Sequence, residues 1–183
     1  RNILMLSRRY LSGGIAELDG VKIDTRPIAS RSIKNLIFKG TYEEDERVLL
    51  ARLCRPGDTV LEIGAGIGVV GLVAARLCAG GGVVSYEANP EMEAAIRASY
   101  ALNLLTPELI CEAVTVDGLP TAFHLTENII SSSAFSRPGA DAPTVTVSSV
   151  SFQEALRQSR ANLVVVDVEG LEDALLRGAD LSS

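Results

Sequence analysis

The feature that most constrains this chain is a short apolar run that ends in closely spaced glycines. Residues 59–63 (Thr-Val-Leu-Glu-Ile) are followed by Gly64, Gly66 and Gly68, and a helix-like stretch continues over residues 69–77. Glycines at this spacing allow a tight turn from a strand into a helix, and they let a ligand lie against the backbone beside the positive end of the helix. The sequence therefore predicts a strand, a ligand-binding turn and a helix.

The segments that follow the turn continue this alternation. Residues 83–87 are strand-like, Asn89 and Pro90 are typical of a helix start, and residues 109–116 predict a third strand. These strands are apolar throughout rather than alternating, which is typical of a parallel sheet covered on both faces. We therefore predict an α/β fold with a doubly wound, mostly parallel sheet.

Segments before the glycine turn carry weaker patterns. We expect strands or extended chain around residues 21–23 and 36–38. Thr41 and Glu44 match a capping box, which predicts a helix whose buried stripe comes from residues 48–53.

Residues 117–147 interrupt the alternation. We interpret residues 121–126 and 144–150 as an inserted antiparallel pair with a Ser-rich loop between its strands. Ser151 and Glu154 then match a second capping box, which opens a helix.

The most apolar strand of the chain comes late, at residues 163–168, and a short helix over 171–177 follows it. A strand of this kind belongs in the middle of a sheet, with a neighbour on each side. We therefore expect that C-terminal strands are missing from this chain, or that a partner chain covers the edge.

Composition excludes several classes of protein. Hydrophobic residues make up 47% and charged residues 22% of the 183 residues, which excludes disordered and collagen-like chains. The sequence lacks an apolar run of about 18 residues, so it predicts no membrane span, and its start does not resemble a signal peptide. Its three cysteines are widely spaced, which predicts neither a disulfide framework nor a zinc site. We expect a cytoplasmic protein.

The net charge of −6 is unevenly divided, because residues 1–40 carry 8 Lys or Arg against 3 Asp or Glu. The basic residues are scattered rather than gathered into a patch, so we expect neither a nucleic-acid partner nor a membrane surface. We interpret residues 1–40 as a solvated N-terminal extension and residues 41–183 as one domain.

Carboxylates flank the glycine turn. Glu87 closes the next strand, where an acid can accept both hydroxyls of an adenosine ribose. Glu62 lies two residues before Gly64, where it would repel a pyrophosphate but can help to hold a zwitterion that bears a sulfonium. Asp167 and Glu169 add two acids at the end of a later strand, in the crevice where open α/β sheets bind ligands.

Two cofactor classes compete for this turn. Gly66, Gly68 and Gly71 also satisfy the dinucleotide fingerprint, so NAD(P) remains an alternative. The density of acids favours a cationic cofactor, S-adenosyl-L-methionine, over a dianion.

Five stretches together resemble the FkbM-type family of S-adenosylmethionine-dependent methyltransferases. They are residues 41–43, 60–68, 86–90, 165–172 and 176–179, and the similarity covers roughly residues 37–181. The resemblance implies a seven-stranded, Rossmann-like fold of the class I methyltransferase type. It also implies methyl transfer to a hydroxyl oxygen of a small molecule, of sugar or polyketide type.

Two departures from the family pattern stand out. Glu62 and Ala65 occupy positions near the glycine turn where family members commonly carry Asp or Asn variants. The strands expected after Gly178 are also absent.

The cofactor contacts expected from these motifs are Glu62, Gly64, Ala65, Gly66, Gly68, Glu87, Ala88 and Asn89. We expect Asp167 or Glu169 to accept the proton of the acceptor hydroxyl or to orient it. Weaker candidates for substrate contacts are Tyr42, Asn128 and Ser132. Tyr42 and Glu43, at the start of a predicted helix, are weaker candidates still to cover the cofactor. His124, the only histidine, lies in an apolar run, where we expect a structural role, and no metal site is indicated.

Three functions follow from these patterns: an O-methyltransferase, an NAD(P)-dependent oxidoreductase on the same turn, and a non-catalytic binding module. The expected partner is a small-molecule hydroxyl acceptor. The sequence leaves the identity of the acceptor and the presence of a homo-oligomer open.

Overall fold

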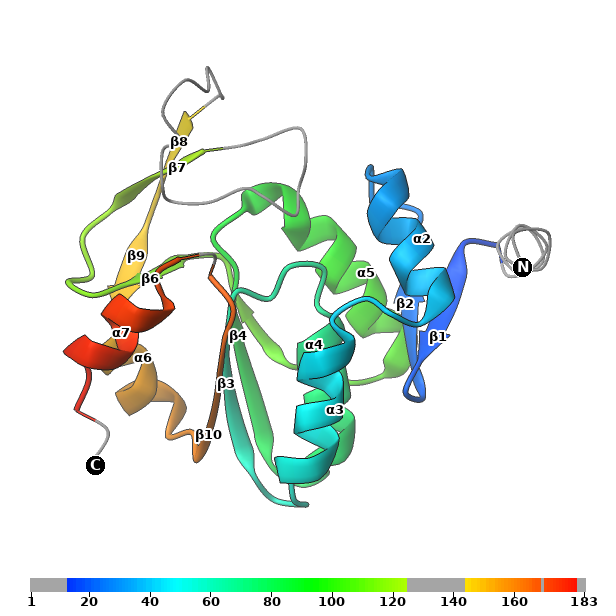
Figure 1. The fold of residues 1–183 in the computed structure, drawn as a ribbon, viewed down its shortest axis with the longest axis horizontal. Coiled ribbons are helices and arrows are strands. Elements are labelled where there is room, and N and C mark those ends of the chain that lie inside the picture. The colour runs from blue at the N-terminus through cyan, green and yellow to red at the C-terminus, as the bar shows by residue number, and fades with distance from the viewer. Residues whose placement is uncertain (1–12, 125–143, 169, 181–183) are drawn as a thin grey trace.

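A computed structural model describes residues 13–124, 144–168 and 170–180 (Figure 1). The strands are β1 (Ile15–Leu18), β2 (Val21–Asp24), β3 (Thr59–Ile63), β4 (Gly82–Tyr86), β5 (Glu108–Ile110), β6 (Ala113–Thr115), β7 (Thr121–His124), β8 (Thr144–Val147), β9 (Ser149–Ser151) and β10 (Leu163–Val166). The helices are α2 (Arg31–Lys39), α3 (Glu44–Leu53), α4 (Val69–Leu77), α5 (Glu93–Asn103), α6 (Phe152–Ser159) and α7 (Glu172–Gly178), with a 3₁₀ turn at Pro90–Met92. Asn128, Ser132 and Glu169 lie outside the described residues.

A four-stranded parallel sheet forms the centre of the fold, in the order β10-β3-β4-β5. Val60 packs with Val70 of α4 on one face of β3, whereas Leu61 and Ile63 pack on the other face with residues of α6 and α7. Helices therefore cover both faces, which explains why these strands are apolar throughout. The predicted α/β fold with a parallel sheet is confirmed.

β10 forms one edge of this sheet and pairs with β3 alone among the described strands. All four of its residues are half-buried. The sequence-based expectation that further strands or a partner cover this edge stays a prediction.

The described part of the N-terminal segment is folded onto the body of the protein. Val21 and Ile23 of β2, together with Ile33 and Ile37 of α2, are buried in the same cluster as residues of α4 and α5. The interpretation of residues 1–40 as a solvated extension is therefore wrong for residues 13–40, because β2 and α2 each direct apolar side chains into this cluster, two residues apart in the strand and four apart in the helix. The predicted boundary after residue 40 stays a prediction.

Residues 36–38 are helical, not extended as predicted. Ser30 caps the N-terminus of α2 by accepting from the Ile33 N–H, and Gly40 ends the helix with a left-handed backbone (φ 82°). These two capping residues define a helix around the short apolar run, which on its own did not distinguish helix from strand.

The start and the buried face of α3 also differ from the prediction. Glu43 is the N-cap with φ 47°, and its side chain makes no capping hydrogen bond, so the predicted capping box of Thr41 and Glu44 is absent. Leu50 is buried, but Val48, Leu49 and Leu53 are exposed, so α3 packs against α4 with a narrower apolar stripe than predicted.

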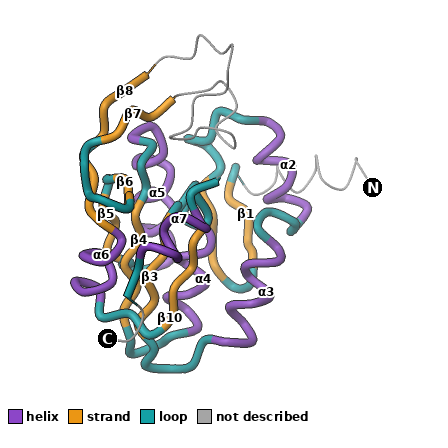
Figure 2. The backbone as a smooth tube through the Cα atoms, turned by 60° about the vertical axis from the view of Figure 1, so that its left-hand side comes forward, coloured by secondary structure: helices purple, strands orange, loops and turns teal. Residues whose placement is uncertain are grey.

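The inserted region follows the prediction in outline. β7 and β8 form the expected antiparallel pair, and both views place them on the side of the sheet where β3 and β4 end (Figures 1 and 2). The Ser151 hydroxyl caps α6 by accepting from the Glu154 N–H, as predicted. The single strand predicted at residues 109–116 is instead split into β5 and β6, and β6 pairs in parallel with β9.

No helix within the described ranges is both long and apolar enough to span a bilayer.

Arg47 of α3 connects the N-terminal hairpin to the rest of the fold. Its buried guanidinium forms an ion pair with Asp19, at the turn between β1 and β2. It also donates to the carbonyl oxygens of Gly40 (2.7 Å) and Tyr42 (2.9 Å). One side chain therefore fixes the hairpin turn and the connection from α2 to α3.

Replacing Arg47 with Met should destabilise the protein by about 2–3 kcal/mol, because two carbonyl oxygens and the Asp19 carboxylate lose a charged donor. Urea unfolding monitored by circular dichroism measures this loss. Arg52→Met, at an exposed position on the same helix, should change stability by no more than about 0.5 kcal/mol. Equal unfolding midpoints for the two variants would contradict the role given to Arg47.

Candidate functional site

The glycine turn between β3 and α4 is held by the ends of the neighbouring strands. The backbone N–H groups of Gly64 and Ala65 both donate to the Tyr86 carbonyl at the end of β4 (2.9 and 3.0 Å). On the other side, the N–H of Asp167, just after β10, donates to the Ile63 carbonyl (2.9 Å). The turn is therefore fixed at the carboxyl end of the sheet, where open α/β sheets bind ligands.

Gly64 has no room for a side chain. Its φ is +91°, and a Cβ atom at this position would lie 1.9 Å from the backbone oxygen of Asp167. The backbone after β10 therefore packs directly against the turn, because Gly64 has no Cβ atom.

The Glu87 carboxylate binds the same turn from the end of β4. Its Oε2 atom accepts from the Gly66 N–H and its Oε1 atom from the Asn89 N–H, both at 2.7 Å. Burial raises the pKa of Glu87 to about 7, although these backbone donors lower it. The predicted ribose-binding acid is thus also an integral part of the turn.

Asn89 combines a structural role with an unused donor. Its Oδ1 atom accepts from the Glu91 N–H (3.0 Å) and caps the 3₁₀ turn, as predicted. Its Nδ2 atom is buried and has no hydrogen-bond partner among the residues that the structure describes. An unpaired buried donor costs free energy, and a ligand acceptor would remove that cost.

Glu62 lies beneath the turn rather than in the crevice above it. Its side chain is 1% exposed, and neither carboxyl oxygen has a hydrogen-bond partner within the described chain. A Cβ atom on Gly71 of α4 would lie 2.5 Å from Glu62 Oε2 and 2.8 Å from Ser85 Oγ, so Gly71 leaves the space that this carboxyl occupies. Burial raises the pKa of Glu62 to about 7.

Tyr42 and Glu43 approach the turn from the connection between α2 and α3. A Cβ atom on Gly66 would lie 3.2 Å from the Tyr42 hydroxyl and 3.4 Å from Glu43 Oε1. Burial, and then the charge of Glu43, raise the pKa of Tyr42 well above its usual value. Burial likewise raises the pKa of Glu43 well above its usual value.

Asp167 is the exposed member of this group of acids. Its negative charge contributes to the raised pKa of Tyr42, Glu43, Glu62 and Glu87. The structure therefore gathers acids from β3, β4, α3 and the end of β10 around one turn.

Sequence reasoning identified most of these residues. It identified the glycines, Glu62, Glu87, Asn89 and Asp167, which the fold brings together. It gave Glu43 only a weak role, at a helix start that covers the cofactor, and it did not predict that the Glu43 carboxyl is directed toward Gly66. Within the described ranges, no group of His, Cys, Asp and Glu is arranged to hold a metal ion.

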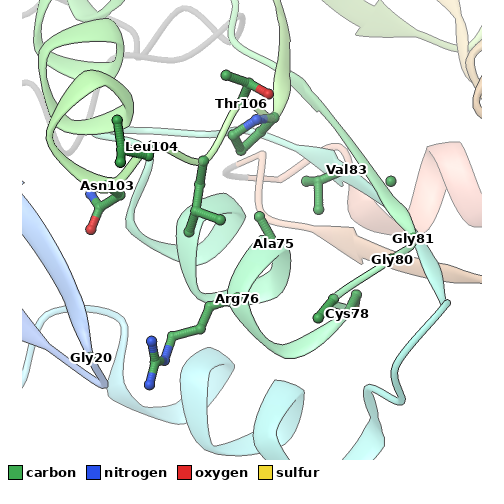
Figure 3. Close-up of a pocket in the computed structure, with 14 residues that line it drawn as sticks. Gly20, Ala75, Arg76, Cys78, Gly80, Gly81, Val83, Asn103, Leu104 and Thr106 are labelled. Carbon is green, nitrogen blue, oxygen red and sulfur yellow. The ribbon is translucent and has the colours of Figure 1, made fainter.

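A separate cavity of about 550 Å³ lies at the other end of the sheet (Figure 3). It is lined by Gly20, by Arg76 and Cys78 near the end of α4, by Gly82 at the start of β4 and by Asn103. None of the acids around the glycine turn lines it, so the cavity and the candidate site are distinct.

Residues 62–183 match the sequence profile of the Methyltransferase FkbM domain. The chain belongs to the FkbM methyltransferase family. The cofactor of this family is S-adenosylmethionine. No curated protein matches the chain.

Three solved structures resemble part of this FkbM-family chain. PH0793 of Pyrococcus horikoshii, described as a transferase, is 21% identical with a TM-score of 0.38, over 52% of this chain and 34% of its own. TYW2 of the same organism, in complex with MeSAdo, is 21% identical with a TM-score of 0.36, over 52% and 33%. Trm5b of Pyrococcus abyssi is 17% identical with a TM-score of 0.38, over 58% and 33%. The chain spans about a third of each solved chain.

Gly64→Ala should destabilise the protein far more than Gly57→Ala. Both glycines have a φ of +91°, but a Cβ atom on Gly57 would meet nothing within 4 Å. Gly57→Ala therefore costs only backbone strain, about 1–2 kcal/mol, whereas Gly64→Ala adds a steric clash of about 1–3 kcal/mol or more. Thermal and urea unfolding of the two variants measure the difference, and equal losses would show that the contact with Asp167 is not tight.

The stability of the protein should fall as the pH rises from about 4.5 to about 7. Glu62 and Glu87 each have a pKa raised to about 7, so the folded protein holds these protons over a range in which the unfolded chain has released them. Each group contributes a slope of up to about 1.4 kcal/mol per pH unit.

Glu62→Gln should remove one of these two contributions, so its stability relative to wild type should rise with pH across this range. Urea unfolding at a series of pH values measures the slope, and the exposed Glu91→Gln serves as the control. If Glu62→Gln and wild type have parallel profiles, the Glu62 carboxyl is not the group that holds the proton.

Proposed function

We propose that this protein transfers the methyl group of S-adenosylmethionine to a hydroxyl oxygen of a small molecule, of sugar or polyketide type. The observation that carries the proposal is the glycine turn of an FkbM-family chain, fixed at the carboxyl end of a parallel sheet and surrounded by acids. We also infer that the four parallel strands are the core of a larger, Rossmann-like, doubly wound sheet of class I methyltransferase type.

The residues around the turn fit an adenosyl cofactor. The Glu87 carboxylate faces the turn and retains lone pairs beyond the two backbone bonds it accepts, so it can also accept from ribose hydroxyls. The unpartnered Nδ2 atom of Asn89 is a donor for a ring nitrogen. We propose that the backbone of Gly64, Ala65, Gly66, Gly68 and Ala88 completes the cofactor contacts.

The electrostatics of the turn favour a cation. Glu43, Glu62, Glu87 and Asp167 all act on one small region, and a dinucleotide would bring a pyrophosphate dianion into it. A sulfonium or ammonium group would instead be attracted. This observation favours the methyltransferase over an NAD(P)-dependent oxidoreductase, which is the second candidate.

When bound, S-adenosylmethionine supplies an electrophilic methyl group and a neutral thioether leaving group. The protein aligns the acceptor oxygen with that methyl group and removes the hydroxyl proton as the oxygen–carbon bond forms. We assign the proton acceptor to Asp167, because it is exposed at the carboxyl end of β10 beside the buried acids. Glu169 is the alternative base, and we propose that Tyr42, Asn128 and Ser132 contact the acceptor.

Isothermal titration tests the cofactor. S-adenosylhomocysteine should bind the purified protein, and NADH should not bind at the same concentrations. Release of S-adenosylhomocysteine in the presence of a panel of sugars and alcohols then tests the reaction. Binding of NADH in preference to S-adenosylhomocysteine would overturn the proposal, and cofactor binding with no turnover on any acceptor would favour the binding module.

Asp167→Asn separates the roles of binding and catalysis. Because the amide cannot accept the proton, turnover should fall by about 10²–10⁴ while the affinity for S-adenosylhomocysteine changes little. Asp173→Asn, at an exposed position on α7, should retain full turnover. Full turnover of Asp167→Asn would move the role of base to another residue.

A further inference from the structure

Glu43 is the N-cap residue of α3, but its side chain does not cap the helix. An acid at an N-cap position normally accepts hydrogen bonds from the free N–H groups of the first turn. Glu43 has a left-handed backbone (φ 47°, ψ 42°) and makes no such bond. Its carboxyl group is directed instead toward the glycine turn, where Oε1 would lie 3.4 Å from a Cβ atom on Gly66.

The Glu43 carboxyl is only partly satisfied in this position. Its side chain pairs with the Tyr42 hydroxyl, and that interaction moderates the effect of burial on the pKa of Glu43. The Oε2 atom is fully buried and has no hydrogen-bond partner in the described ranges. A buried acceptor without a partner is costly, so a ligand that supplies a donor or a positive charge here would be strongly favoured.

The fold keeps this carboxyl in place. Arg47, four residues later on α3, donates to the carbonyl oxygens of Gly40 and Tyr42 and so fixes the backbone that leads to Glu43. The Arg47 guanidinium is used for these oxygens and for Asp19, and it forms no ion pair with Glu43. Arg47 therefore fixes the backbone beside Glu43 without forming an ion pair with the Glu43 carboxyl.

Acids from different elements act on Glu43. They are Glu46 of α3, Glu62 of β3 and Asp167 after β10, and each of them raises the pKa of Glu43. Like charges at this density require a cation or a bound proton.

We propose that Glu43 is the counter-ion of the positively charged aminoacyl arm of the cofactor, through its sulfonium or its α-ammonium group. This inference rests on the proposed function, since it requires S-adenosylmethionine on the glycine turn. It assigns recognition of the charged arm to the segment between α2 and α3, whereas Glu87 and Asn89 serve the nucleoside.

A series of three ligands tests the assignment and identifies the charge. S-adenosylmethionine carries both cationic groups, S-adenosylhomocysteine carries only the ammonium, and 5′-methylthioadenosine carries neither. Glu43→Gln should weaken the binding of S-adenosylmethionine at least about tenfold and leave 5′-methylthioadenosine within about twofold of wild type. An equal loss for S-adenosylhomocysteine identifies the ammonium as the partner, and an unchanged affinity identifies the sulfonium.

Glu44→Gln is the matched control, because it removes the same charge from the next residue, which is exposed. It should leave all three affinities within about twofold of wild type. If Glu43→Gln binds S-adenosylmethionine as wild type does, or loses all three ligands equally, the inference is overturned. If wild-type protein binds none of the three ligands, the proposed function itself fails.

Proton release gives a second readout on wild-type protein. A cation beside Glu43 would ionise its carboxyl, so binding of S-adenosylmethionine should release protons, seen as a binding enthalpy that depends on the ionisation enthalpy of the buffer. Glu43→Gln should release fewer protons than wild type, because the amide has no proton to release. If that variant does not fold, Glu43→Asp, whose carboxylate is withdrawn by one methylene, replaces it in the series of three ligands. Equal proton release by wild type and the variant would overturn the inference.

Discussion

The contact between the Asp167 backbone oxygen and Gly64 is the constraint on which the candidate site depends. It brings the end of β10 against the end of β3, two strands that are more than 90 residues apart in sequence. The Tyr86 carbonyl fixes the same turn from β4. Three parallel strands therefore converge on a few backbone atoms, and the side chains that follow each strand meet there.

That convergence concentrates negative charge, and the protein tolerates it in two ways. Some charge is balanced by backbone donors, as in the contacts of Glu87 with Gly66 and Asn89. The rest is suppressed by protonation, because burial raises the pKa of Glu62 and Glu43. The site is consequently less stable than a neutral core would be, and a cationic ligand recovers part of that stability.

The glycine turn, the flanking strands and the acids at their ends could be predicted from the sequence. Each is specified locally, by β-branched runs that end in glycine and by the rule that parallel strands present their carboxyl ends together. The helix over residues 36–38 was missed because its identity depends on caps at Ser30 and Gly40, outside the short apolar run.

Side-chain direction was the harder problem. Glu62 was expected to face the cofactor, yet its carboxyl lies under the turn beside Gly71, because side chains in a strand alternate between faces and Val60 already packs toward α4. The direction of the Glu43 side chain could not be predicted either, since Glu43 has a left-handed backbone and the Tyr42 carbonyl before it is fixed by Arg47, which also pairs with the distant Asp19. The role of a residue cannot be predicted from the local sequence pattern when that role depends on tertiary contacts.

The Arg47 bridge has a consequence for engineering the N-terminal hairpin. Asp19 lies at the tip of the hairpin. Arg47 pairs with Asp19 and also donates to the Tyr42 carbonyl, in the backbone beside the glycine turn. Shortening, lengthening or grafting the loop between β1 and β2 should therefore change ligand affinity at the glycine turn, which lies elsewhere in the sequence. The hairpin is therefore a poor place for an insertion, because its conformation is coupled to the backbone beside the ligand-binding turn.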